Sequence, residues 1–335
     1  MEAGTAEWYG QVVEEVLEPD TRIVDPHHHL WPSGGALPYG TDELVGDTQG
    51  GHQIVATVFI ECGAARRTDG PAHLRPVGET EFVTAAIEQL AADHPDAPPI
   101  AGIVAHADLT LEPDELNEVL DAHAAAADGR LVGIRDALAR ALEPEVLTIR
   151  ASYAEGKYAD DAFRRGVRTL GQRGLTYDTW HYHHQNPELL ELARAVPETT
   201  MVLDHFGTPL GVGKYDGRRD EVFDEWATGI TDLADCDNIV AKLGGLAMPD
   251  NGFGWHTADR PPTSDEFVEA QARYYHHTIE AFGPERCMFE SNFPIDRFSL
   301  SYPVLWNALK KIASRYTPDE RAAMFEDTAR RVYGI

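Results

Sequence analysis

The chain alternates short apolar runs, rich in β-branched residues, with segments of helical periodicity along almost its whole length. The apolar runs predict strands at 23–29, 54–61, 100–107, 131–137, 174–181, 200–206, 238–244 and 286–292. Several are nearly continuously apolar, as in parallel strands that are covered on both faces. Helical patterns lie between and after them, at 79–93, 113–127, 159–172, 187–196, 219–235, 264–282, 302–314 and 317–331. This order predicts a (β/α)₈ barrel.

A doubly wound open sheet is the alternative fold for such an alternation. It is disfavoured because no Gly-x-Gly-x-x-Gly turn follows an early strand. A length of 335 residues is ordinary for a one-domain barrel. We therefore expect a single barrel domain at 21–335, preceded by an N-terminal arm or helix at 1–20. The long connections at 62–78, 139–158 and 247–263 follow strand ends, so they are expected to cover the barrel mouth.

The formal net charge of −28 limits the partners of the protein. Nucleic acids and anionic membrane surfaces would be repelled, so neither is expected as a partner, and a small molecule is the expected substrate. The N-terminus lacks the basic start and apolar core of a signal peptide, and no apolar run is long enough to span a bilayer. These features predict a cytoplasmic protein. A homo-oligomer is compatible with the sequence.

The first predicted strand ends in Asp25-Pro26-His27-His28-His29. Successive side chains of a strand point to opposite faces, so Asp25, His27 and His29 are expected on one face. Two imidazoles so placed can bind one metal ion or one anionic group. We interpret His27 and His29 as functional and His28 as structural.

Polar residues also occur at or near the ends of the other predicted strands. These residues are Glu61, Arg135, Asp178, His181, His205, Lys242, Glu290 and Asn292. In a (β/α)₈ barrel the carboxyl ends of all strands meet at one mouth, where active sites form. The recurrence of such residues at nearly every strand end predicts an active site at this mouth.

The segments VDPHHHLW (24–31), VGIRDAL (132–138), VLDHFGTP (202–209) and RCMFESNFPID (286–296) resemble those of the amidohydrolase-related family. The similarity is to the branch that contains sugar-lactone and pyrone-dicarboxylate lactonases. It implies a (β/α)₈ barrel and, most often, hydrolysis of a lactone or amide, although some relatives decarboxylate aromatic acids. Metal use varies in this branch, and some of its lactonases use none.

At matching positions, the resemblance implies that His27, His29 and His205 are candidate metal ligands and that Arg135 faces the substrate. The family usually has Gly-Ser-Asp-x-Pro on the last strand, whereas this chain has Glu290-Ser291-Asn292-Phe293-Pro294. An amide cannot accept a proton at neutral pH, so Asn292 cannot be the general base. Our hypothesis is that Glu290, two residues earlier on the same face, supplies the carboxylate and that Asn292 orients water or substrate.

The expected reaction is hydrolysis of a cyclic ester or amide of a small carboxylated or ring-containing substrate. For this reaction we expect either one bound divalent metal ion, Zn²⁺ or Mn²⁺, or a site that works without a metal. A decarboxylase or other lyase and a catalytically inactive binding protein remain alternatives. Asp204 neighbours His205 on the strand, so it is expected on the opposite face, as a partner on the helix side or behind the site residues and not as a catalyst. The candidate substrate-binding residues are Lys242, His181, Asp178, Trp255 and Glu61.

Overall fold

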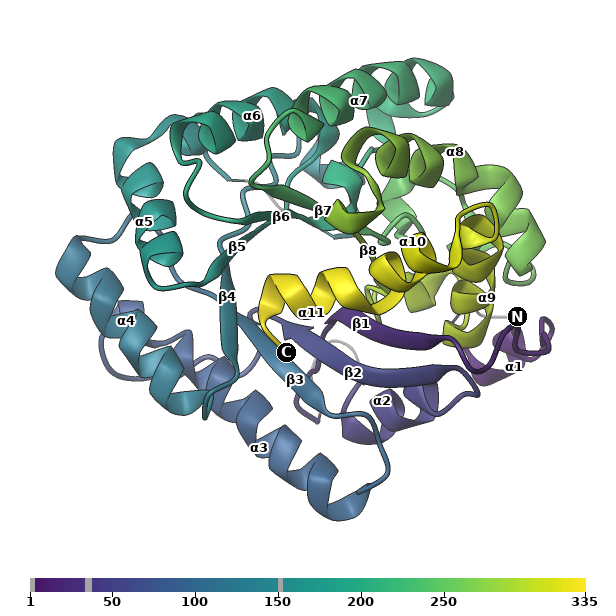
Figure 1. Cartoon of the computed structure of the whole chain (residues 1–335), viewed down its shortest axis with the longest axis horizontal. Coiled ribbons are helices and arrows are strands. Elements are labelled where there is room, and N and C mark those ends of the chain that lie inside the picture. The colour runs from purple at the N-terminus through teal and green to yellow at the C-terminus, as the bar shows by residue number, and fades with distance from the viewer. Residues whose placement is uncertain (1–3, 34–37, 150–152) are drawn as a thin grey trace.

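The computed structural model describes residues 4–33, 38–149 and 153–335. Eight parallel strands, hydrogen-bonded in chain order, form a nearly closed barrel with flanking helices, which confirms the predicted (β/α)₈ fold (Figure 1). All eight predicted strands are present. They are β1 (Arg22–His28), β2 (Gln53–Ile60), β3 (Ile100–Ala105), β4 (Leu131–Arg135), β5 (Thr176–Thr179), β6 (Met201–Leu203), β7 (Ile239–Leu243) and β8 (Cys287–Phe289).

The helices form a ring outside the strands (Figure 1). Those that were predicted are α3 (Val77–Asp93), α4 (Pro113–Ala126), α5 (Asp161–Gln172), α6 (Asn186–Ala195), α7 (Arg219–Ala234), α8 (Ser264–Phe282) and α9 (Tyr302–Ala313). The predicted helix at 317–331 is present as α10 (Pro318–Ala322), a π-helical turn at Ala323–Asp327 and α11 (Thr328–Tyr333). The prediction missed α2 (Thr41–Thr48), a short helix whose acidic, glycine-containing sequence has no strong apolar period.

The C-terminal helix closes one end of the barrel (Figure 1). Ala329 and Tyr333 of α11 belong to the same buried cluster as barrel-interior side chains such as Val24, Val58 and Met288. The Tyr333 hydroxyl donates to Asp178 Oδ2 at 2.5 Å. The loops that follow the strands form the opposite end, so the barrel has one open mouth.

Strand β1 contains a bulge at its proline, and this bulge determines which histidines face inward. Asp25 pairs with Thr57, but the next pair is His28 with Phe59, so β1 advances three residues while β2 advances two. Asp25 accepts hydrogen bonds from the Ser291 amide at 3.0 Å and the Tyr302 hydroxyl at 2.9 Å. The expectation that Asp25 shares a face with His27 and His29 is therefore wrong, because the bulge shifts the alternation by one residue.

The N-terminal segment packs against the barrel and contains the short helix α1 (Ala6–Tyr9). Further along it, the Glu14 carboxylate accepts hydrogen bonds from the Ser264 amide at 2.7 Å and from its hydroxyl at 2.5 Å. This contact satisfies a free amide at the start of α8. None of the helices in the part of the chain that the structure describes is both long and apolar enough to cross a bilayer.

Candidate active site

A cavity of about 450 Å³ opens at the mouth of the barrel, above the carboxyl ends of the strands. Its floor includes His29, Arg135, His205 and Asn292. Its walls come from the loops after β1, β2, β3, β4, β5, β7 and β8. The wall residues include Trp31, Glu61, Arg66, Asp136, Ile149, Tyr153, Lys157, Trp180, Met248 and Ile295. The volume suits a small ring-containing molecule.

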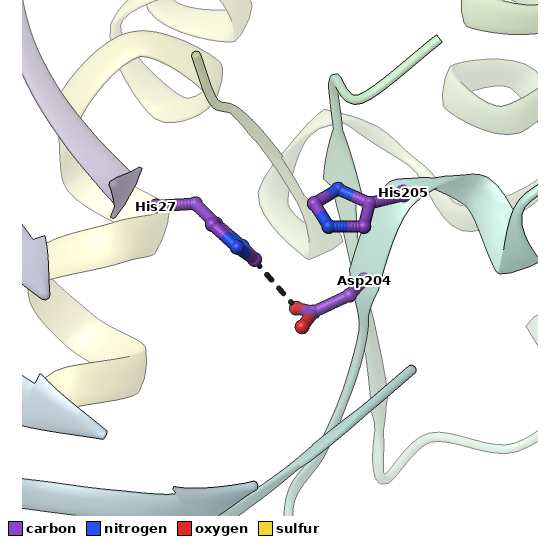
Figure 2. A group of neighbouring side chains, drawn as sticks. All are labelled: His27, Asp204 and His205. Atoms are coloured by element: carbon purple, nitrogen blue, oxygen red, sulfur yellow. Dashed lines mark ion pairs between the residues drawn. The ribbon is translucent and has the colours of Figure 1, made fainter. Parts of the chain in front are cut away.

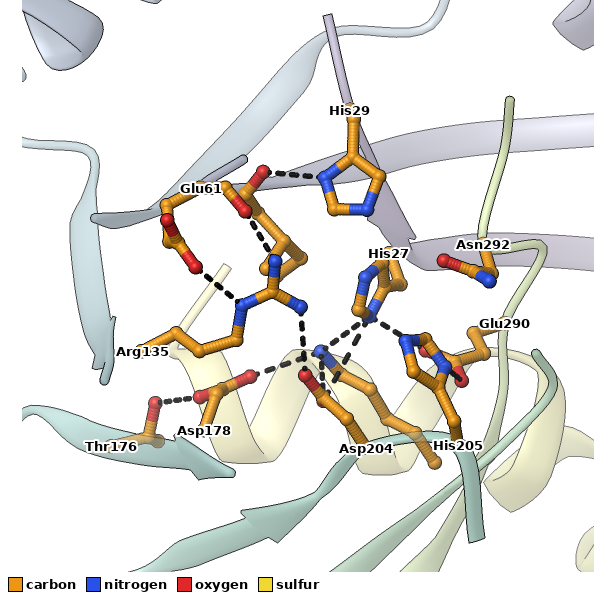
Figure 3. A network of polar contacts seen from close by, with 12 residues as sticks. His27, His29, Glu61, Arg135, Thr176, Asp178, Asp204, His205, Glu290 and Asn292 are labelled. Carbon is orange, nitrogen blue, oxygen red and sulfur yellow. Dashed lines mark hydrogen bonds and ion pairs between the residues drawn. The ribbon is translucent and has the colours of Figure 1, made fainter. Parts of the chain in front are cut away.

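Three histidines at the floor are each oriented through Nδ1 (Figure 3). His205 Nδ1 lies 2.6 Å from Glu290 Oε1, and His27 Nδ1 lies 2.9 Å from Glu290 Oε2. His29 Nδ1 lies 2.8 Å from the carbonyl oxygen of Ile60. Because the partners of His29 and His205 are acceptors, we assign the ring proton of these two histidines to Nδ1, which leaves a free lone pair on Nε2. His27 Nδ1 also lies 3.4 Å from Lys242 Nζ, a donor, so its two neighbours do not select one tautomer.

Burial keeps two of these histidines neutral. Desolvation lowers the pKa of His27 well below its usual value, and the nearby Lys242 ammonium lowers this pKa further. Desolvation likewise lowers the pKa of His29, together with the charge of Arg135. In the described part of the chain, His27 Nε2 is buried and has no hydrogen-bond partner. Neutral imidazoles with free Nε2 atoms can accept a proton or bind a metal ion.

The turn after β6 places two adjacent residues in the same cluster. The strand ends at Leu203, and His205 and Phe206 have φ values of 54° and 58°. This left-handed backbone interrupts the alternation of a strand. The expectation that Asp204 lies on the opposite face from His205 is therefore wrong, whereas its expected role as a supporting partner agrees with its contacts to Arg135 and Lys242 outside the cavity lining. A Cβ atom on Gly245 would clash with the His205 ring, so only glycine allows this close approach.

A buried ammonium lies beneath the histidines. Lys242 Nζ is 3.0 Å from Asp178 Oδ2 and 3.1 Å from Asp204 Oδ1, and all three side chains are fully buried. Burial opposes the charge of Lys242, but Asp204 and Asp178 outweigh it and raise the lysine pKa. Desolvation raises the pKa of Asp178, whereas Lys242 acts in the opposite direction. This network supports the floor of the cavity from below.

Arg135 connects the network to the cavity. Its Nε donates to Glu61 Oε1 at 2.8 Å, its Nη1 donates to Asp204 Oδ2 at 3.3 Å, and its Nη2 donates to the Glu61 carbonyl oxygen. Burial opposes the charge of Arg135, but Glu61 and Asp204 outweigh it and raise the pKa. Arg135 and Glu61 therefore present a fixed ion pair to the cavity.

Glu290 and Asn292 differ in their access to the cavity. Glu290 is fully buried behind His205 and is not among the residues that line the cavity, so water there meets His205 first. Asn292 lines the cavity and donates from Nδ2 to Asp296 Oδ1 at 2.9 Å. In Figure 3 its carbonyl oxygen points toward the histidines. A direct contact between Glu290 and the attacking water does not fit this placement.

Four of the expected substrate-binding residues lie outside the cavity lining. Lys242 and Asp178 lie below the floor. His181 Nδ1 contacts Thr179 Oγ1 at 3.0 Å and Tyr158 at 3.1 Å, and its Nε2 lies 2.9 Å from Asn186. Trp255 stacks on Phe253 and Phe267, with ring centroids at 5.1 and 5.6 Å. Strand β5 ends at Thr179, so His181 belongs to a turn, and the flap of Trp255 packs on α8 instead of over the mouth.

Several residues that line the cavity were not predicted, and Asp204, which lies behind the lining, was assigned to the wrong face. The left-handed turn that follows Asp204 has no clear sequence signature. Arg66 and Lys157 lie in long loops, where strand alternation provides no prediction of direction. The one sequence signal for Arg66 and Lys157 was that each is a basic residue in a loop predicted to cover the mouth.

His27, Asp204 and His205 form a group that could hold a metal ion, with one ligand atom from each within 4.8 Å of the others (Figure 2). The charge of the surroundings fits a cation. Buried carboxyl groups outnumber the permanent cations here. The carboxyl groups belong to Glu61, Asp178, Asp204 and Glu290, and the cations are Arg135 and Lys242. The partnerless Nε2 of His27 fits as well.

Comparison with known proteins agrees with this architecture. The amidohydrolase family model matches residues 24–335. A curated relative, the uncharacterized protein y4mH of Sinorhizobium fredii, is 30% identical over 94% of this chain and 99% of its own length. The L-fucono-1,5-lactonase of Burkholderia multivorans is 29% identical over 53% of this chain and 58% of its own length.

A solved amidohydrolase from Burkholderia multivorans, in a crystal form with bound zinc, superposes with a TM-score of 0.70. It is 24% identical, and the match covers 93% of this chain and 99% of that protein. This likeness concerns the fold. The family match shows that the chain belongs to the amidohydrolase family. It is an enzyme of the hydrolase class.

Proposed function

We propose that this protein hydrolyses a lactone, with the corresponding cyclic amides as the neighbouring substrate class. The observation that carries the proposal is the 2.6 Å contact between His205 Nδ1 and Glu290 Oε1. A carboxylate at Nδ1 fixes the tautomer of an imidazole and stabilises the imidazolium that forms when Nε2 takes a proton. The partial similarity to an L-fucono-1,5-lactonase supports the choice of a cyclic ester.

In the proposed reaction, water in the cavity gives its proton to His205 Nε2 and attacks the substrate carbonyl carbon. The Asn292 carbonyl oxygen accepts the second hydrogen of that water and so orients it. Glu290 acts through His205 as a positioning residue, since it does not reach the cavity. In this mechanism the water proton goes to His205 and not directly to Glu290, as the sequence had suggested. The Glu290 carboxylate is still required, because it orients His205.

Arg135 supplies positive charge where the carbonyl oxygen becomes negative. One such preorganised donor contributes about 3–4 kcal/mol to a transition state. Glu61 and Asp204 hold the guanidinium in place, so it does not have to reorganise during the reaction. When the ring opens, the proton on His205 Nε2 passes to the leaving oxygen, which restores the neutral histidine.

A divalent metal ion would be held by His27, Asp204 and His205, and imidazole and carboxylate ligands of this kind suit Zn²⁺ or Mn²⁺. When bound, such an ion supplies Lewis acidity and lowers the pKa of water. The His205–Glu290 contact is required in that form too, since it keeps the proton on Nδ1 and leaves Nε2 free for the metal.

Turnover of sugar and aromatic lactones in ¹⁸O-labelled water tests the proposal. Hydrolysis places one labelled oxygen in the carboxylate of the ring-opened product, because the water oxygen attacks the carbonyl carbon. Mass spectrometry of the product measures this incorporation. Release of carbon dioxide from an aromatic acid, with no ring-opened product from any lactone, would instead identify a decarboxylase and contradict the proposal.

A further inference from the structure

The cavity wall differs in charge from the rest of the protein. The whole chain carries 56 acidic and 28 basic residues. Of the residues that line the cavity, three are basic and three are acidic; these are Arg66, Arg135 and Lys157, and Glu61, Asp108 and Asp136. Because the charges of this lining balance in a strongly acidic protein, an anion is repelled less at this mouth than elsewhere on the protein.

The acidic groups of the wall already have partners. Glu61 pairs with Arg135 at 2.8 Å. Asp108 accepts hydrogen bonds from the Thr110 amide at 2.9 Å and its hydroxyl at 2.6 Å, and Asp136 accepts one from the Leu109 amide at 3.1 Å. Burial raises the pKa of Asp136 to about 6, so this group loses its negative charge only below neutral pH.

Two basic groups of the wall remain without such partners. Arg66, from the loop after β2, and Lys157, from the loop after β4, form no ion pair and donate no side-chain hydrogen bond within the ranges that the structure describes. Lys157 is near enough to Asp108 and Asp136 to favour their ionised forms, yet it pairs with neither. The cavity thus offers unused donors, which are complementary to an acceptor on the ligand.

We propose that Arg66 and Lys157 form a subsite that binds a carboxylate substituent of the substrate, while the ring to be opened lies at His205. Arg66 is exposed and Lys157 is half-buried, whereas His205 and Arg135 are buried, so the carboxylate lies toward the outer end of the cavity. The rings of Trp31 and Trp180 also line the cavity and provide apolar surface for the rest of the molecule. This inference rests on the proposed function and narrows its substrate class to carboxylated lactones.

Binding without turnover tests the subsite separately from the reaction. The probes are benzene-1,3-dicarboxylate and the matched neutral compound benzene-1,3-dicarboxamide, and the measurement is calorimetry or quenching of tryptophan fluorescence. We expect the dicarboxylate to bind more tightly than the diamide and to bind more weakly as salt is added. Arg66→Gln and Lys157→Gln should each raise the Kd of the dicarboxylate about tenfold, the loss expected for one charge-assisted contact, and should leave the diamide unchanged.

Arg194→Gln is the control, because it removes one positive charge from an exposed position on α6 outside the cavity lining. It should change the Kd of neither probe. Equal affinity of the wild-type protein for both probes, or equal weakening of both by Arg66→Gln and Lys157→Gln, would overturn the subsite. Selective binding of the dicarboxylate without hydrolysis of any lactone would leave the subsite standing and contradict the proposed reaction. Hydrolysis of lactones with no preference for carboxylated ones would support the proposed reaction and contradict the subsite.

Discussion

Replacing Glu290 with glutamine is expected to lower kcat by about 10²- to 10⁴-fold and to leave KM within a few-fold of the wild-type value. The amide keeps the size of the side chain but loses the charge that holds the proton on His205 Nδ1 and stabilises the imidazolium. The KM is insensitive because Glu290 does not touch the cavity. Steady-state kinetics on a hydrolysed lactone measure both constants, and circular dichroism checks that the variant is folded.

The control for this prediction is the pair of variants His205→Asn and Glu290→Gln, made singly and together. Residues that act as one unit have non-additive effects, so the double variant should be no less active than His205→Asn alone. Additive losses would assign independent roles to the two residues. Near-normal turnover of Glu290→Gln would contradict the proposed pairing.

Replacing Lys242 with methionine is expected to lower the free energy of unfolding by about 3–5 kcal/mol. The ammonium lies between Asp178 and Asp204, at 3.0 and 3.1 Å, and none of the three side chains is exposed. Its removal leaves two carboxylates buried beside each other without their shared cation, whereas methionine keeps most of the apolar volume. Urea unfolding followed by fluorescence measures the loss.

A compensating change separates this charge effect from a packing effect. In the Lys242→Met background, Asp178→Asn removes one of the stranded charges, so the double variant should be more stable than Lys242→Met alone. Tyr333 still donates to the residue at 178 in that variant, which limits new unsatisfied groups. A loss below about 1 kcal/mol for Lys242→Met, or no recovery in the double variant, would show that the ammonium does not hold this network together.

The order of the elements was predictable because each strand and most helices have a strong periodicity of their own. All eight strands lie within the ranges predicted for them or start one residue earlier. Strand ends were predicted less well. The ranges 174–181 and 200–206 extend past β5 and β6, where polar residues continue an extended-looking pattern in turns.

The predicted side-chain directions were wrong where the backbone departs from a regular strand. The bulge at Pro26 turned Asp25 away from the two histidines, and the left-handed conformation of His205 placed the His205 side chain on the same side as Asp204. Neither event changes the apolar pattern that the prediction used. His181 and Trp255 were placed near the mouth by proximity in sequence, whereas their positions depend on packing with Asn186 and Phe267. Alternation alone cannot provide that information.

In the proposed mechanism, the buried carboxylate of Glu290 keeps the proton of His205 on Nδ1 and leaves Nε2 free to face the cavity. The ¹⁵N chemical shifts of histidine-labelled protein at neutral pH, with His205 assigned by its loss in His205→Asn, report this tautomer. We predict a protonated Nδ1 and an unprotonated Nε2, and a mixture of tautomers in Glu290→Gln. A neutral His205 with its proton on Nε2 in the wild-type protein would contradict the account.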